Sequence, residues 1–176
     1  ILLFKNNMSI EEVKYYPSGE LKSLFHNKNS GNTLCGNEFY KSGAIRYMYC
    51  RHPKTGINGE LKEFYETGEL LTIVNFKNHK RQGKLREYSK AGNLIQLLPF
   101  QEGKLQGWAF KYQANGRRIN EKYYFEDTMY YLKIFDLKDS IKYLDQIFPT
   151  FSFDKENYCK GDTLNFTTVF KSDKLF

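Results

Sequence analysis

The histidines are the side chains of this sequence best suited to acid–base or metal chemistry, and their spacing argues against both. His26, His52 and His79 lie 26 and 27 residues apart, whereas histidine motifs for metals or catalysis bring two side chains within a few residues. The chain also has no GxxxxGK[ST] phosphate loop and no GxSxG nucleophile elbow. We therefore expect solvated histidines in the connections between elements, and no catalytic residue, metal site or cofactor.

The remaining reactive side chains also fit a structural role better than a chemical one. Cys35, Cys50 and Cys159 are odd in number and lack a CxxC spacing, so neither a disulfide framework nor a zinc site is predicted. We expect three free or buried thiols, which mildly favours a reducing compartment. Glutamates recur through the middle of the chain, where we expect solvated positions on a sheet: Glu60, Glu63, Glu66 and Glu69.

Charge is distributed unevenly along the 176 residues. Residues 1–126 hold 20 basic and 12 acidic residues, a net charge of +8, whereas residues 127–176 hold 7 and 8. The basic side chains are densest in one segment, which we predict to be a partner-binding surface: Lys77, Lys80, Arg81, Lys84, Arg86 and Lys90. Such a stripe favours an acidic protein or an anionic membrane surface, with nucleic acid less favoured. The alternative is a solvated connection that only keeps the protein soluble.

These side chains are carried by an internal repeat. Five glycines follow one another at spacings of 24, 25, 24 and 24 residues, and an aromatic residue stands four positions before each: Tyr15 and Gly19, Phe39 and Gly43, Phe64 and Gly68, Tyr88 and Gly92, Tyr112 and Gly116. A second glycine stands nine positions before the first in the later units, as Gly59, Gly83 and Gly107. We call the aromatic residue that stands four positions before each of the five glycines the fixed aromatic.

Each unit predicts one β-hairpin. In the third unit, alternate residues from Leu70 to Phe76 are apolar or β-branched, which is the pattern of a strand with two different faces. The glycine four positions after the fixed aromatic marks a turn that needs a positive φ. A lone hairpin is barely stable, so the units must stack. The predicted fold is mainly β, an elongated antiparallel array of tandem hairpins over residues 1–126, with the fixed aromatics forming a ladder.

The repeat is predicted to stop near Asp127. Residues 136–148 place Leu137, Ile141, Leu144 and Phe148 on one helical face, which predicts a helix capped by Asp136 or Asp139. Residues 163–170 are rich in Thr and Phe and predict a strand. We expect residues 127–176 to form a helix-and-strand cap over the open end of the array. A partner-binding element or the start of a second domain is the alternative.

Composition limits the class of protein further. Aromatic residues make up 17% of the chain, which argues against a disordered segment or a coiled coil. No stretch approaches the ~18–20 apolar residues of a membrane span. The opening ILLFK is too short for the core of a signal peptide, and the chain starts at Ile1 instead of Met. We expect a cytoplasmic protein, and the secreted or cell-surface alternative stays open because the native N-terminus is not seen.

The repeat resembles a known family. The segments GELKEFYETGEL and FQEGKLQGWAFKYQANG are similar to the variant MORN repeat (membrane occupation and recognition nexus), and the resemblance extends over residues 10–126. It implies an elongated, twisted hairpin array with a concave face. Bacterial proteins with tandem units of this variant are often grouped as antitoxin components, the YwqK-like group. The resemblance therefore implies a bacterial antitoxin or immunity component whose partner is a toxin.

Three functions follow as expectations. The first is a non-enzymatic scaffold that binds another protein, in its most specific form a toxin. The second is a peripheral membrane or polyanion binder that uses the basic stripe. The third is a secreted or surface-exposed adhesion protein.

Overall fold

The computed structural model describes residues 4–5, 8–28, 32–136, 138, 140–153 and 166–172. No helix occurs among these residues, so this part of the chain contains no helix that could span a membrane. The regular elements are strands: β1 (Phe4–Lys5), β2 (Met8–Tyr15), β3 (Leu21–Asn27), β4 (Leu34–Phe39), β5 (Ile45–His52), β6 (Gly56–Ile57), β7 (Gly59–Phe64), β8 (Leu70–Lys77), β9 (Lys80–Tyr88), β10 (Leu94–Gln101), β11 (Lys104–Leu105), β12 (Gly107–Tyr112), β13 (Arg118–Phe125), β14 (Thr128–Phe135), β15 (Ile141–Phe153) and β16 (Phe166–Ser172).

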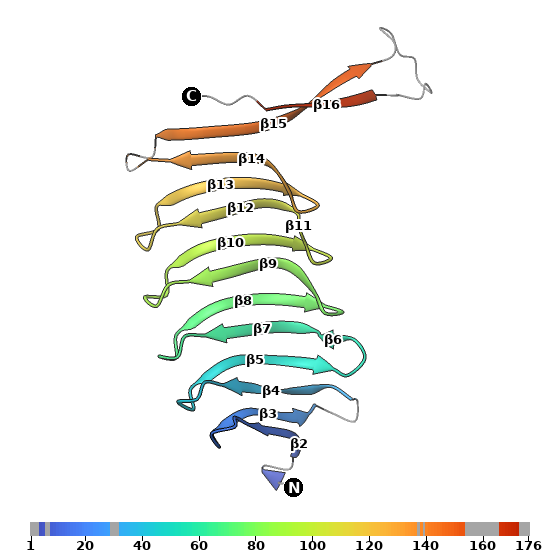
Figure 1. The fold of residues 1–176 in the computed structure, drawn as a ribbon, viewed down its shortest axis with the longest axis vertical. Coiled ribbons are helices and arrows are strands. Elements are labelled where there is room, and N and C mark those ends of the chain that lie inside the picture. The colour runs from blue at the N-terminus through green and yellow to red at the C-terminus, as the bar shows by residue number, and fades with distance from the viewer. Residues whose placement is uncertain are drawn as a thin grey trace.

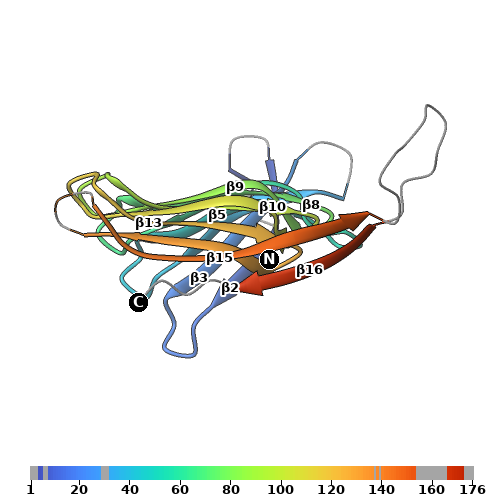
Figure 2. The same ribbon diagram turned by 90° about the horizontal axis from the view of Figure 1, so that it is seen from above.

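The strands form one open antiparallel sheet in which each pairs with its neighbours in sequence (Figure 1). The short strands β6 and β11 lie beside this path and pair with β5 and β10. Viewed along the long axis, β2 and β3 run at an angle to β13 and β15, so the sheet twists along its length (Figure 2). The predicted array of tandem hairpins is confirmed, and it is a single layer.

The repeated glycines build the turns along one edge of the sheet. In the third unit, the Tyr65 N–H donates to the Glu69 carbonyl at 2.8 Å and the Gly68 N–H donates to the Tyr65 carbonyl at 2.9 Å. Gly68 has a φ of +101°, which a side chain would disfavour. The same pair of bonds recurs in the other four units, so these predicted turns are confirmed.

Two-residue turns connect strands along the opposite edge. Asn78 and His79, Glu102 and Gly103, and Glu126 and Asp127 have positive φ at both positions, as hairpin turns matched to the sheet twist require. Close by, each glycine of the second set lies directly opposite an aromatic residue of the adjacent strand: Gly59 and Phe76, Gly83 and Phe100, Gly107 and Tyr124. Because the glycine has no side chain, each aromatic ring has room to lie over the neighbouring strand.

A one-layer sheet has little interior. Among the side chains that the structure describes, the buried apolar ones are Phe25, Val74, Phe100 and Ala109. Hydrogen bonds between units supplement this packing. The first joins the Tyr16 hydroxyl, as donor, to the Phe39 carbonyl at 2.7 Å. Two further bonds repeat it one and two units later, from Tyr40 to the carbonyl of Phe64 and from Tyr65 to that of Tyr88.

The predicted helix over residues 136–148 is wrong, because residues 141–153 form β15 and pair with β14. The carboxylate of Asp136 accepts hydrogen bonds from the N–H groups of Lys138 and Ser140, at 2.7 and 2.9 Å. This is the bonding expected of a helix cap, but here it closes a hairpin turn. Local capping chemistry therefore could not distinguish the two structures.

The hairpin pattern continues where the repeat was predicted to stop. Phe135 pairs with Ile141, and the Asp136 N–H donates to the Ser140 carbonyl at 2.8 Å, as at the equivalent place in each earlier turn. Phe135 thus takes the place of the fixed aromatic in a sixth unit. β13, β14 and β15 carry the sheet across residue 126 without a gap in pairing. The predicted strand near residues 163–170 is found as β16, while residues 163–165 lie outside the described residues.

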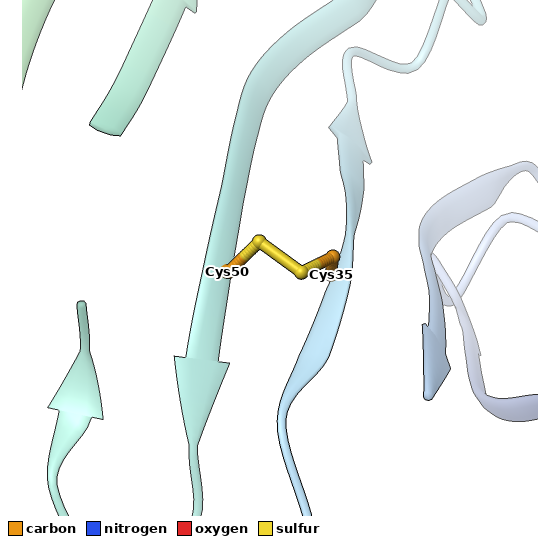
Figure 3. Close-up of a disulfide and its surroundings, with 2 residues drawn as sticks. All are labelled: Cys35 and Cys50. Atoms are coloured by element: carbon orange, nitrogen blue, oxygen red, sulfur yellow. A yellow bond between two sulfur atoms is a disulfide. The ribbon is translucent and has the colours of Figure 1, made fainter. Parts of the chain in front are cut away.

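Two of the three cysteines are not free thiols, contrary to expectation. Cys35 in β4 and Cys50 in β5 form a disulfide (Figure 3). They are directly opposite each other in the antiparallel ladder, with their Cα atoms 4.0 Å apart. The turn at Gly43 sets this register, so a spacing of 15 residues that shows no motif becomes a cross-strand pair. Cys159 lies outside the described residues.

Candidate functional site

The predicted basic stripe crosses the full width of the sheet. Its six residues lie at the end of β8, along β9 and in the following turn: Lys77, Lys80, Arg81, Lys84, Arg86 and Lys90. Lys84 and Arg86 share one face, because side chains two residues apart on a strand point the same way. The Arg81 guanidinium lies 5.2 Å from the centre of the Phe100 ring on the other face.

The remaining members of the stripe lie at the two edges of the sheet. Lys80 pairs with Glu102 at 3.7 Å beside one set of turns. Lys90 lies at the opposite edge, 5.6 Å from the centre of the Tyr65 ring. Of the six predicted residues, the structure thus brings only Lys84 and Arg86 together on one face of the sheet. The other four lie on the opposite face or at the edges.

A second set of charged residues lines up across the strands. The residue immediately before each fixed aromatic is charged, and these five residues occur on alternate strands of the array: Lys14, Glu38, Glu63, Glu87 and Lys111. Their neighbours in the ladder are Ser23, Tyr47, Thr72 and Gln96, which complete an unbroken series of cross-strand pairs. We call the five charged residues the charge row and the face that carries them the groove face.

The middle of the groove face is hollowed. An open concavity of about 520 Å³ extends over β4 to β10 and contains all three glutamates of the charge row. Apolar side chains line it beside the row: Leu61, Val74, Phe76, Leu85 and Leu98. A smaller hollow of about 170 Å³ adjoins Lys111. The surface therefore combines a line of charges with an apolar floor, and several hairpins share it.

Two of the three glutamates are held by tyrosines. The Tyr49 hydroxyl donates to Glu38 Oε1 at 2.6 Å. Burial raises the pKa of Tyr49 above its ordinary value, and the hydrogen bond to Glu38 raises it further. The pKa of Tyr47 is also raised, first by burial and then by its hydrogen bond to Glu63. Both phenols therefore stay neutral donors well above neutral pH, and they orient the carboxylates that they contact.

The third glutamate differs from these two. The carboxylate of Glu87 makes no hydrogen bond or ion pair with any residue that the structure describes. The ion pair of Glu63 is loose, since Arg46 Nε lies 3.9 Å from its Oε1. All three carboxylates therefore keep acceptor sites for a further donor.

The opposite face, which we call the back face, carries Lys84, Arg86 and the disulfide. Trp108 is also on this face, with 45% of its surface exposed. Its ring meets those of Tyr123 and Tyr131 edge-on, with centroids 5.2 and 5.1 Å apart. The two faces thus differ in chemistry, and the back face combines basic and aromatic groups.

The histidines do not come together. His26 lies within β3 and not in a connection as expected, and its Nδ1 is buried without a hydrogen-bond partner. His52 ends β5 and its Nδ1 accepts from the Lys54 N–H at 3.2 Å, whereas His79 lies in a turn. In the described part of the chain, no group of three or more His, Cys, Asp or Glu side chains is placed to hold a metal ion.

Comparison with known proteins identifies one unit of the array. Residues 57–78 match the MORN repeat variant. The matched segment covers β7, its turn and β8, so this MORN unit is the hairpin that carries Glu63 and Thr72 of the groove face. No curated protein matches the chain.

The charge row escaped prediction because its residues differ in type. Glutamates such as Glu63 lie at repeat positions that are also typical of solvated residues on a sheet, so each one alone predicts no site. The signal was nevertheless in the sequence, since a charged residue precedes the fixed aromatic in all five units. The tyrosines that join the units were also missed, although their position repeats: Tyr16, Tyr40 and Tyr65 each follow the fixed aromatic.

Proposed function

We propose that this protein is a non-enzymatic scaffold that binds another protein on the surface of its sheet. The groove face supports this most directly. It offers an open concavity of about 520 Å³ with an apolar floor and oriented carboxylates, and it extends over several hairpins. Repeat arrays present extended surfaces of this kind to protein partners. A toxin neutralised by this chain is the most specific form of the proposal, and the variant MORN unit is what suggests it.

A second candidate function uses the back face. Lys84 and Arg86 point to the same side of β9, and neither has an acidic partner among the described residues. Two adjacent uncompensated cations support binding to an anionic surface, such as a membrane or another polyanion. This candidate predicts binding that weakens steeply with salt.

The disulfide bears on the compartment in which this function operates. Disulfides form and persist in oxidising surroundings and are rare where thiols are kept reduced. The Cys35–Cys50 bond therefore supports the secreted or cell-surface alternative over the cytoplasmic one.

Capture by the immobilised full chain tests the scaffold proposal. The chain would be exposed to extract of the cells that produce it, and bound proteins identified by mass spectrometry. Beside the wild type we would use Lys84→Ser with Arg86→Ser on the back face, and Glu38→Gln with Glu63→Gln and Glu87→Gln on the groove face. The proposal expects at least one protein that one of these two variants fails to retain. Retention of no protein, or equal retention by all three chains, would contradict it.

A further inference from the structure

The charge row has a definite order. Along the array it runs basic at Lys14, acidic at Glu38, Glu63 and Glu87, and basic again at Lys111. Arg46 makes only the loose 3.9 Å pair with Glu63, and Arg81 lies at the other margin of the concavity, over the Phe100 ring, so the middle of the row stays acidic. A partner that follows the row must therefore be basic in the middle. It can be acidic at the Lys111 end, whereas Lys14 is already paired with Glu12 at 3.0 Å.

The row also has a definite spacing. Glu38, Glu63 and Glu87 lie on β4, β7 and β9, with one strand between each pair. Adjacent strands lie about 4.8 Å apart, so successive glutamates are roughly 9.6 Å apart along the array. The cross-strand pairing fixes this distance, which does not depend on a flexible loop.

One regular chain conformation has the same period. A polyproline II helix has three residues per turn and rises about 3.1 Å per residue, so every third side chain points the same way, roughly 9.3 Å further on. Side chains on one face of a β-strand are about 6.7 Å apart. On an α-helix, two turns advance about 10.8 Å, and this mismatch grows along the row.

We infer that the groove face binds an extended protein segment in the polyproline II conformation, with basic side chains at every third residue. This rests on the scaffold function proposed above and names the class of its partner. Each basic side chain meets one carboxylate of the row, where Glu38 and Glu63 are already oriented by tyrosines. The residues between the basic ones lie over an apolar floor that includes Leu61, Val74 and the ring of Phe76. Aromatic-lined grooves of this kind accept proline rings.

A synthetic peptide tests this directly. The matched probe, Lys-Pro-Pro-Lys-Pro-Pro-Lys, has lysine at every third position, and the control, Lys-Pro-Lys-Pro-Lys-Pro-Pro, has the same composition with lysine at every second. Each would carry a terminal fluorophore, and fluorescence anisotropy would measure its binding to the full chain at low salt. We expect the matched probe to bind at least fivefold more tightly. Equal affinity for both peptides, or binding of neither, would overturn the inference.

Matched variants show which surface binds. The groove variant combines Glu38→Gln, Glu63→Gln and Glu87→Gln, and we expect it to weaken binding of the matched probe by more than tenfold. The charge-matched control combines Glu60→Gln, Glu66→Gln and Glu102→Gln, which remove the same charge outside the groove face. We expect the control to change affinity less than twofold, with both variants folded by circular dichroism. Equal losses in the two variants would mean that net charge, and not the row, attracts the peptide.

The capture experiment separates this inference from the function on which it rests. A captured protein that the groove variant retains, and that the variant of Lys84 and Arg86 loses, would leave the scaffold function intact and overturn the inference. Capture of no protein by any chain would contradict the scaffold function itself, whatever the peptide does.

Discussion

The Tyr40 hydroxyl donates a 2.8 Å hydrogen bond to the main-chain oxygen of Phe64, 24 residues further along the chain. The bond joins one hairpin to the next. Ser89 and Gln113 take the tyrosine position in the next two units. The tyrosine ladder therefore belongs to the N-terminal half of the array, where the groove face begins.

Replacing Tyr40 by Phe removes this bond and keeps the ring. Because the bond is partly buried, we expect the free energy of unfolding to fall by about 1 kcal/mol. Urea unfolding followed by circular dichroism would measure it. The control is Tyr15→Phe, because Tyr15 is 62% exposed and the change should cost less than about 0.5 kcal/mol. A Tyr40 variant as stable as the control would contradict the structural role of the ladder.

The sequence was sufficient to predict the architecture wherever its signals repeat. Glycines and fixed aromatics recur in phase, so the hairpin turns from Gly19 to Gly116 were predicted correctly. At the sixth unit Asp139 occupies the glycine position, while Phe135 and Ile141 keep theirs. Without the glycine, an apolar spacing that also fits a helix suggested the wrong structure. Residues 141–153 form a strand because they pair with β14. The apolar spacing within the segment carries no information about that pairing.

The disulfide and the groove face needed the register of the strands. Cys35 and Cys50 are paired only because the turn at Gly43 and the bulge beside Phe39 bring them opposite each other. Glu38 and Glu63 become neighbours in a row only when the strand between them is placed. Such relationships follow from the order and offset of strands, so residue types alone predict neither.

Thiol titration tests the disulfide. Under denaturing, non-reducing conditions we expect one reactive thiol per chain of the three cysteines, that of Cys159. Cys35→Ser with Cys50→Ser opens a loop of 15 residues, and it should lower the free energy of unfolding by about 3 kcal/mol. Cys159→Ser is the control. Three reactive thiols in the wild type would contradict the bond.

Tyr49 should make the protein sensitive to alkali. Burial and Glu38 raise its pKa in the folded state, so its contribution to stability is complete below the ordinary tyrosine value near pH 10. Above that pH the unfolded chain ionises first, and the contribution is lost as the pH rises. We expect the free energy of unfolding to fall less steeply from about pH 9 to about pH 12 in Tyr49→Phe than in the wild type. Equal slopes would mean that Tyr49 titrates normally.

The turn at Glu102 and Gly103 offers a stabilising change. Glu102 has a φ of +50°, a conformation that asparagine tolerates better, and Asn-Gly is the preferred pair for this turn. The ion pair of Glu102 with Lys80 is exposed and contributes little. Glu102→Asn should therefore raise the free energy of unfolding by about 0.5 kcal/mol. Glu60→Asn, in β7, should lower it because asparagine is unfavourable in strands, so a change of the same sign in both would contradict the assignment.

Each glutamate of the charge row should contact one basic side chain of the extended partner. A double-mutant cycle between Glu63→Gln and a matched probe whose central lysine is replaced by norleucine measures this contact by fluorescence anisotropy. Each single change should weaken binding about fivefold, and both together should also weaken it about fivefold, because either change alone already removes the contact. A combined loss of about twenty-fivefold would show that the two groups act independently, and it would contradict the claim.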